Sequence, residues 1–139
     1  MYLVDTNVIA EFRKHGTARM NPNVARWVDG VDAEDIYFSV ISMLEIEKGI
    51  LLLARKGSRQ ADLLEKWFRY DLLPSFAERI LPVSLPVALA CAALHVPDKR
   101  PSHDALIGAT AKEHRLTLVT RNTSDFAGMG VPLKNPFLA

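Results

Sequence analysis

The chain has 139 residues, of which 49% are apolar and 24% charged, and 17 Lys and Arg against 16 Asp and Glu give a formal net charge of +1. This length fits one domain that buries roughly 70% of its unfolded surface without a disulfide or a structural metal. The apolar share is too high and the net charge too small for an intrinsically disordered chain. A dedicated nucleic-acid binder is often strongly basic, so any contact with a polyanion must come from a local patch.

The single cysteine, Cys91, excludes an internal disulfide and any zinc site built from cysteines. Its small apolar neighbours favour a buried side chain over a nucleophile. The N-terminal residues lack the basic segment and long apolar run of a signal peptide, and no uncharged stretch of 18 apolar residues is present to span a membrane. We therefore expect a cytoplasmic domain.

Short apolar runs alternate with helical patterns along the whole chain. The runs are rich in β-branched and aromatic residues, which is typical of buried strands. The helical segments carry apolar residues at helical spacing, and Asn, Pro and Gly punctuate their ends. In chain order the expected elements are strand 2–4, helix 6–14, helix 22–28, strand 36–40, helix 42–56, helix 59–72, strand 79–81, helix 86–95, helix 102–114, strand 116–120 and strand 131–133. This alternation predicts an α/β domain on a parallel sheet with right-handed crossovers.

Four acidic residues fall where the chain leaves a strand or enters a helix. Asp5 and Asp125 follow expected strands, and Glu45 and Asp104 lie in the first turns of expected helices. Open parallel sheets bind ligands beyond the carboxyl ends of their strands. We therefore expect these four carboxylates at one edge of the sheet.

Each of these acids also has a purely structural interpretation. Acids near a helix N-terminus favour the helix dipole and satisfy free N–H groups. Glu45 completes the capping-box pattern that begins at Ser42, and Asp125 suits a turn cap within residues 122–125. Taken singly, any one of the four fits a structural role.

Two features taken together favour a shared site. Glu45 and Asp104 each share a helical stripe with small and apolar residues that should face the sheet, so both carboxylates point inward. Two charges about 4 Å apart repel by roughly 4 kcal/mol at an effective dielectric near 20, so such a cluster takes up protons or is built around a cation. Because the ligands are all oxygens, Mg²⁺ or Mn²⁺ is the expected cation.

Four segments, Val4–Ile9, Ser42–Gly49, Asp104–Ala111 and Leu118–Phe126, follow one another in an order and spacing that resembles PIN-domain ribonucleases. The resemblance is strongest to the VapC- and FitB-type toxins of bacterial toxin–antitoxin systems and covers nearly the whole chain. It implies a single PIN domain over residues 1–139, with about five parallel strands flanked by helices.

The resemblance also implies roles for the four acids. Asp5 and Asp104 match the most characteristic metal-binding aspartates of the family, and Glu45 and Asp125 complete the pocket directly or through water. Glu47 is a rival to Glu45 because this helix is apolar nearly all round, and the capping-box position in the first turn favours Glu45.

Further residues near these acids are candidates for supporting roles. The resemblance implies that Thr6, Asn7 and Asn122 hold the carboxylates in place. His103, directly before Asp104, either touches the substrate or is an ordinary exposed residue at a helix start. Basic side chains are candidates for holding an RNA backbone near the pocket. These are Lys48, Arg121 and the pair Lys99–Arg100.

The implied activity is Mg²⁺- or Mn²⁺-dependent hydrolysis of RNA phosphodiester bonds by a metal-activated water. The implied partners are a small antitoxin, a second copy of the chain, and a larger complex with the antitoxin on operator DNA. The apolar run 50–53 and the aromatic residues at 67, 68 and 70 mark either a thick core or a groove that another chain covers.

Three other classes of protein are compatible with an α/β fold. A phosphoacceptor receiver domain needs an acidic pair near the first strand and a lysine near residue 121, and the chain has neither. A dinucleotide-binding enzyme needs a Gly-rich turn after the first strand, and residues 5–7 contain no glycine. A non-catalytic scaffold on the same fold stays open as the alternative.

Overall fold

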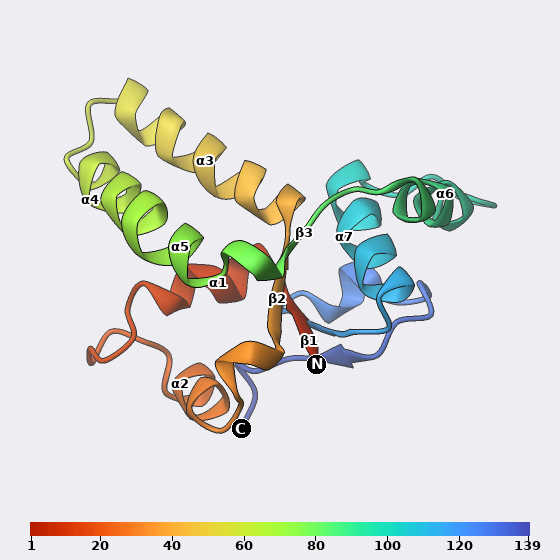
Figure 1. Ribbon diagram of the computed structural model, residues 1–139, viewed down its shortest axis with the longest axis horizontal. Coiled ribbons are helices and arrows are strands. Elements are labelled where there is room, and N and C mark those ends of the chain that lie inside the picture. The colour runs from red at the N-terminus through yellow and green to blue at the C-terminus, as the bar shows by residue number, and fades with distance from the viewer.

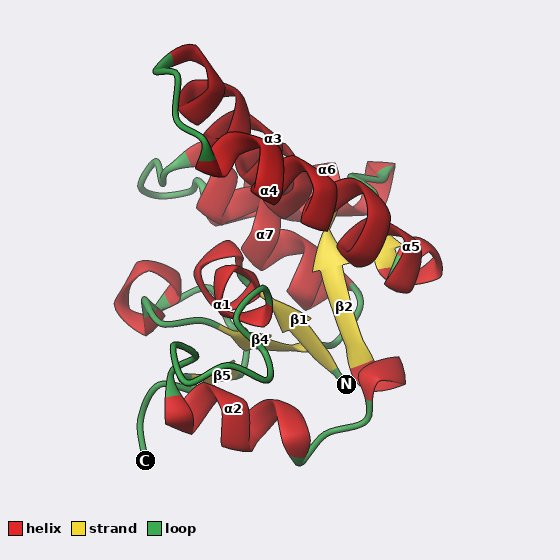
Figure 2. Ribbon diagram, turned by 90° about the vertical axis from the view of Figure 1, so that its left-hand side faces the viewer, coloured by secondary structure: helices red, strands yellow, loops and turns green.

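A central parallel sheet organises the computed structural model, which describes all residues from 1 to 139 (Figures 1 and 2). Its strands are β1 (Tyr2–Val4), β2 (Ile36–Ser39), β3 (Ile80–Leu81), β4 (Thr117–Val119) and β5 (Leu133–Lys134). The α-helices are α1 (Thr6–Phe12), α2 (Pro22–Asp29), α3 (Val40–Arg55), α4 (Gln60–Lys66), α5 (Leu73–Ser75), α6 (Leu85–Leu94) and α7 (Ser102–Glu113). The predicted α/β class with a parallel sheet is confirmed, and none of the helices is both long and apolar enough to cross a membrane.

The strand order is β3-β2-β1-β4-β5, with every neighbouring pair parallel. The chain builds outward from β1 through β2 to β3, and then returns to add β4 and β5 on the other side of β1. The order therefore reverses between β1 and β4, where open α/β sheets form their ligand crevice. The backbone N–H of Asp5 donates to the Val119 carbonyl at 2.8 Å, which joins the ends of these two strands.

Both faces of the sheet are covered by helices, with α6 and α7 on one face and α1 and α2 on the other (Figure 1). Successive residues of β1 serve opposite faces: Leu3 packs into the core with α6 and α7, and Val4 into the core with α1 and α2. Both side chains are almost fully buried. This double burial explains why the strands read as short continuous apolar runs. Cys91 is buried in the first of these cores, and its burial raises the pKa of the thiol.

Helix α3 begins at Val40, two residues earlier than the sequence predicted. Ser39 ends β2 with an extended backbone and caps the helix, because its Oγ accepts a hydrogen bond from the Ile41 N–H at 3.0 Å. Ser42 lies inside the helix, where its buried Oγ has no hydrogen-bond partner. The predicted capping box is therefore wrong, and Glu45 lies in the second turn of α3 rather than the first.

Helix 59–72 was expected to stop before Pro74, but the helical path continues to Ser75. Residues Trp67–Leu72 form a wide π turn in which the Leu73 N–H donates to the carbonyl of Phe68, five residues back. A proline ring clashes with the carbonyl four residues before it in a regular helix. The wider turn relaxes that contact, so the chain passes Pro74 into the short helix α5.

Candidate active site

Asp5 is the most tightly held of the predicted acids. It follows β1 and caps α1, where its Oδ1 accepts a hydrogen bond from the Thr6 N–H at 2.8 Å. Its Oδ2 accepts from Thr120 Oγ1 at 2.8 Å and from Asn7 Nδ2 at 3.2 Å. Only 7% of Asp5 is exposed, so these three donors fix the carboxylate in one orientation.

Glu45 is held from both sides. Its Oε1 accepts a hydrogen bond from Thr6 Oγ1 at 2.6 Å, and its Oε2 lies 3.2 Å from His103 Nδ1. Because a carboxylate oxygen accepts in this hydrogen bond, Nδ1 of His103 is the ring nitrogen that carries the proton. Glu47 does not join the site, because its carboxylate pairs with Arg69 of the neighbouring helical segment. Glu45 is thus the acid of α3 that lies beside the end of β1.

Asp104 and Asp125 complete the group from the other side of β1. Asp104 lies half-buried in the first turn of α7, and Asp125 is exposed in a short helical turn, Thr123–Phe126. Neither carboxylate forms a hydrogen bond or an ion pair with a protein side chain. We call the four carboxylates of Asp5, Glu45, Asp104 and Asp125 the acidic rim.

The pKa shifts of Asp5 and Asp104 indicate that the acids of the acidic rim repel one another. Burial is the largest cause that raises the pKa of Asp5, and the charges of Glu45 and Asp104 add to it, against the hydrogen bonds that Asp5 accepts. Burial also raises the pKa of Asp104, and the charges of Asp125 and Glu45 raise it further, while His103 acts in the opposite direction. No Lys or Arg forms an ion pair with any of the four.

The residues predicted to hold these carboxylates fall into two groups. Thr6 and Asn7 donate directly, as described above. The Asn122 side chain contacts none of the four acids; only its backbone N–H takes part, donating to Thr120 Oγ1 at 3.1 Å. That prediction is wrong for the side chain, because the chain turns away from the sheet at this exposed position.

Two residues that contact the carboxylates were missed or misjudged from the sequence. The sequence placed Thr120 at the end of a strand and gave it no role. Its position directly after β4, the strand that pairs with β1, is the signal that could have placed it beside Asp5. The interpretation of His103 as an ordinary exposed residue is wrong, because its ring is half-buried against Glu45.

The side chains of Lys48 and Arg121, which were predicted to hold an RNA backbone, form no ion pair with the acidic rim. Lys48 is exposed on α3 and lines a shallow hollow with Leu44 and Leu52, in which none of the four acids takes part. The Arg121 guanidinium lies over the ring of Phe137, 4.8 Å from its centroid. Neither side chain contacts a carboxylate of the acidic rim.

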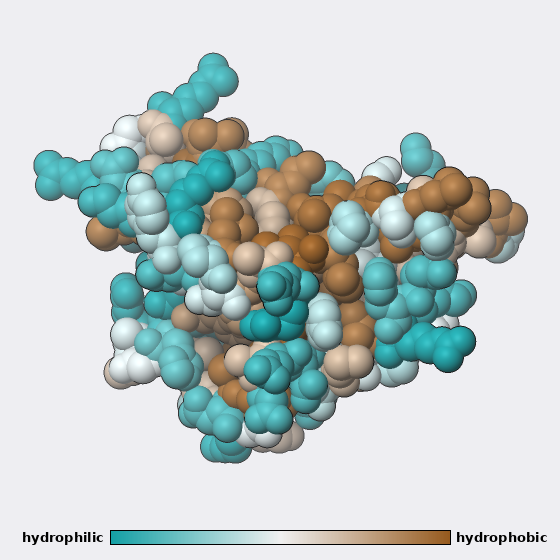
Figure 3. Space-filling model, viewed as in Figure 1, coloured by the Kyte–Doolittle hydropathy of each residue, from teal (hydrophilic) through white to brown (hydrophobic).

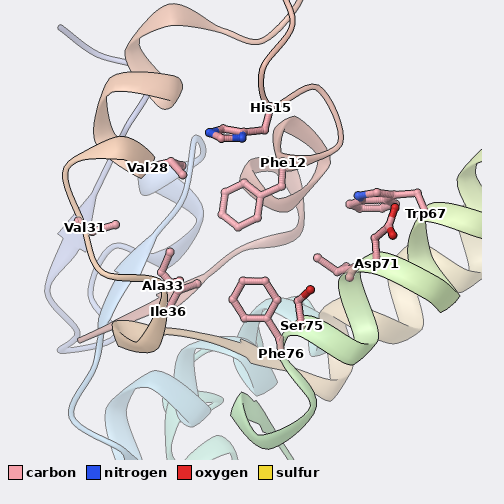
Figure 4. A pocket seen from close by; sticks show the side chains of 11 residues that line it. Phe12, His15, Val28, Val31, Ala33, Ile36, Trp67, Asp71, Ser75 and Phe76 are labelled. Atoms are coloured by element: carbon pink, nitrogen blue, oxygen red, sulfur yellow. The ribbon is translucent and has the colours of Figure 1, made fainter.

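A groove of about 350 Å³ leaves the acidic rim between α1, α3 and α4. Thr6 and Glu45 line one end, and Arg13, Lys14 and Trp67 line it further along. Trp67 also borders an apolar pocket of about 250 Å³, which contains none of the four acids. In Figure 4, the rings of Phe12, Trp67 and Phe76 surround this pocket, with the polar side chains of His15, Asp71 and Ser75 among them.

The donors of the acidic rim suit a hard divalent cation. They are oxygens only, and neighbouring acid charges add to the raised pKa of Asp5 and of Asp104, a repulsion that a bound cation would relieve. No three His, Cys, Asp or Glu side chains lie close enough together to hold a metal ion, so at most two of these carboxylates could bind one directly in this arrangement. This fits Mg²⁺, which usually keeps several of its waters and takes only one or two carboxylates.

An all-parallel α/β sheet with acids at its switch point defines the class of this protein. The family model of the PIN domain matches residues 2–131. The chain is 37% identical to Toxin FitB of Neisseria gonorrhoeae over 99% of each chain, and 31% identical to VapC ribonuclease Y4jK of Sinorhizobium fredii over 99% of this chain and 98% of that one. The structure of FitAB bound to an IR36 DNA fragment has a TM-score of 0.86 at 35% identity, covering 100% of this chain and 97% of that one. The chain belongs to the PIN-domain family and is a homologue of VapC- and FitB-type toxins, so the predicted resemblance is confirmed.

Proposed function

We propose that this protein is a Mg²⁺-dependent endoribonuclease and the toxin component of a type II toxin–antitoxin system. The observation that carries the proposal is the acidic rim itself, four carboxylates at the sheet switch point with no Lys or Arg among them. Full-length similarity to a VapC ribonuclease and to Toxin FitB supports it. Residues 1–139 then act as one PIN domain in the cytoplasm, where its RNA substrate lies.

The acidic rim supplies the ligands for the reaction. Asp5 and Asp104 would hold a Mg²⁺ or Mn²⁺ ion, with Glu45 and Asp125 bound to it directly or through water. The bound ion would acidify the attacking water and neutralise the phosphate oxygens as charge develops. The protein's own contribution is orientation, because Asp5 is fixed by hydrogen bonds from three other residues.

Glu45 and its two partners complete this arrangement. Thr6 and His103 each engage one oxygen of Glu45, so its carboxylate stays directed along the edge of the sheet. Partners that orient metal ligands in this way usually contribute ten- to hundredfold to metal affinity or activity, by order of magnitude. No side chain of the acidic rim needs to act as the nucleophile.

Partners are proposed from the relatives and from the apolar surface. The FitAB structure is bound to a DNA fragment, and similar structures include a toxin–antitoxin complex from Klebsiella pneumoniae and VapBC2 from Rickettsia felis. We propose that a small antitoxin occupies the groove beside Glu45 and Trp67, and that the complex binds operator DNA. Exposed apolar side chains over α3 and α6 (Figure 3), including Leu51 and Leu89, support a homodimer.

Cleavage of a labelled transfer-RNA pool tests the proposed activity. The purified protein is incubated with Mg²⁺ or Mn²⁺ in the absence of any antitoxin, beside a lane with EDTA and an Asp104→Asn variant. We expect cuts that disappear in both controls. Cuts that survive both controls would contradict the assignment of the acidic rim. If the protein neither cuts RNA nor binds Mn²⁺, the non-catalytic scaffold is the better account.

A further inference from the structure

A polar hollow of about 490 Å³ lies beside α7, separate from the acidic rim. It is bordered by the C-terminal end of α6 and by the loop after the Thr123–Phe126 turn. Two cationic side chains, Arg100 and Lys112, and one acid, Asp98, line it. On the right of Figure 3, hydrophilic side chains cover this region of α7 and the loop, below the apolar surface of α6.

Two glycines of the loop let the cations lie against its backbone. Gly128 and Gly130 have φ angles of +81° and +76°, which favour glycine. A Cβ on Gly128 would lie 3.1 Å from Arg100 Nη2, and a Cβ on Gly130 would lie 3.4 Å from Lys112 Nζ. Because these two positions are glycines, the charged ends of Arg100 and Lys112 can lie close to the loop backbone at the hollow.

Both cations keep unpaired donors. Arg100 Nε donates to the Leu94 carbonyl and Nη1 to the Ala127 carbonyl, each at 3.2 Å, which orients the guanidinium and leaves Nη2 without a partner. Lys112 forms no hydrogen bond or ion pair, and Asp98 lies within 4.0 Å of neither cation. An oriented guanidinium and a free ammonium that line the same hollow suit a phosphate group.

The hollow and the acidic rim are parts of one packed unit. Asp104, Gly108 and Lys112 follow one i, i+4 ridge of α7. A Cβ on Gly108 would overlap the Met129 side chain, so the loop packs closely on the middle of this ridge. Asp125 lies at the start of the same segment. Asp104 and Lys112 are eight residues apart, which is about 12 Å along the helix axis.

We propose that Arg100 and Lys112 hold a backbone phosphate of the RNA strand whose scissile bond lies at the acidic rim. The separation of about 12 Å corresponds to only a few nucleotides along a strand. Such a contact positions the strand and reads no sequence. The inference rests on the proposed ribonuclease function and adds the second point at which the substrate is held.

RNA binding by two matched lysine variants tests this subsite. Lys112 lies in the last turn of α7 and Lys56 at the C-cap of α3, and both are exposed, so replacing either with Ala changes the net charge and the helix dipole alike. Each variant is made with Asp104→Asn, so that the RNA is not cut. Binding of a labelled single-stranded RNA is followed by fluorescence anisotropy over a range of salt concentrations.

We expect Lys112→Ala to raise Kd about tenfold at low salt, the loss typical of one hydrogen bond to a charged group. The slope of log Kd against log salt should fall by about 0.7, as for one phosphate contact on a single strand. Lys56→Ala should leave both quantities unchanged. Equal affinities and equal slopes for the two lysine variants would overturn the proposal, as would equal weakening by both.

Cleavage by the single variants, with Asp104 intact, separates this proposal from the proposed function. If the wild type cuts RNA and Lys112→Ala cuts it as efficiently as Lys56→Ala, the subsite is wrong and the nuclease stands. If no chain cuts RNA but Lys112→Ala selectively weakens binding, the phosphate subsite stands and the ribonuclease assignment fails. A selective loss in both assays supports both.

Discussion

Two groups of carboxylates lie on or beside helix α3, and the protein treats their charge in opposite ways. Glu47 faces Glu65 of α4, and Arg69 bridges them, with its Nε 2.6 Å from Glu65 Oε1 and its Nη2 paired with Glu47. Glu45, two residues away, faces the acidic rim, where the nearest basic partner is the half-buried His103. The same helix therefore serves one group that carries its own counterion and one that does not.

The pKa shifts express the same contrast. Burial raises the pKa of Glu47 and the charge of Glu65 adds to it, but Arg69 acts in the opposite direction. Burial likewise raises the pKa of Asp5 and Asp104, and there the neighbouring charges are other acids. The protein supplies an arginine for one acidic pair and none for the four acids of the acidic rim, which favours the proposal that the second group binds a cation from solution. This comparison is the physical basis of the proposed metal site.

The largest expected effect is the loss of cleavage in Asp104→Asn. The substitution keeps the size of the side chain but removes a charged oxygen ligand, so we expect cleavage of RNA to fall by more than about 100-fold. Glu47→Gln, which changes an acid of the group that Arg69 bridges, is the matched control. Its cleavage rate should stay within about twofold of the wild type, because that carboxylate is already paired. Equal losses in the two variants would erase the distinction between the groups.

A smaller loss is expected for Thr120→Val. The valine is close in size but removes the donor to Asp5 Oδ2 and the acceptor of the Asn122 N–H. We expect Mn²⁺ affinity, measured by calorimetry, to fall about ten- to hundredfold, whereas Thr120→Ser should retain most of it. If the valine variant binds Mn²⁺ as the wild type does, Asp5 does not depend on this hydrogen bond.

His103 should have an effect near the lower end of that range. His103→Leu removes the contact to Glu45 Oε2, and a fall of about tenfold in Mn²⁺ affinity is expected. His103→Asn can still donate from its amide, so it should recover part of the loss. Recovery in the asparagine variant is the decisive readout, since a merely structural defect would affect both variants alike.

The smallest effect concerns the stability of the metal-free protein against pH. The folded pKa values of Asp5 and Asp104 are raised, so between their ordinary values near 3.8 and the raised values the folded state holds more protons than the unfolded state. Their contribution to stability therefore falls as pH rises through this window. In EDTA, the difference in Tm between Asp104→Asn and the wild type should shift in favour of Asp104→Asn as the pH rises from acidic to neutral.

Glu11 makes stability depend on pH in the opposite direction, but its effect cancels when Asp104→Asn is compared with the wild type. Burial acts to raise its pKa, but hydrogen bonds from Lys14 and the Asn21 N–H outweigh it, so the pKa is lowered and stability is lost as pH falls. Both chains carry this group. A difference in Tm that does not change with pH would show that Asp104 is not destabilised by its neighbours.

The parallel sheet and the assembly of the acids follow from patterns that the sequence displays directly. Apolar runs such as Tyr2–Val4 are buried on both faces, and Asp5 comes where a parallel strand must end. Each of the four acids sits at such an end or in an early helical turn. The position of these acids at one edge of the sheet therefore follows from the order of strands and helices, which the apolar pattern of the sequence predicts.

The helix cap and the side-chain contacts that the sequence did not predict depend on choices among equally suitable residues or on contacts distant in sequence. Ser39 and Ser42 are equally good caps by residue type, and only the end of β2 decides between them. The contacts of Thr120 and His103 are made across 115 and 58 residues of sequence, respectively, so no local pattern reveals them.

Calorimetric titration of Mn²⁺ into three chains tests the central claim most directly. The chains are the wild type, Asp104→Asn and Glu47→Gln. The two variants each lose one charge, Asp104→Asn from the acidic rim and Glu47→Gln from the group that Arg69 bridges. The account predicts that Mn²⁺ binds the wild type and Glu47→Gln with similar affinity and binds Asp104→Asn far more weakly. Binding that is unaffected by Asp104→Asn, or absent from the wild type, would contradict it.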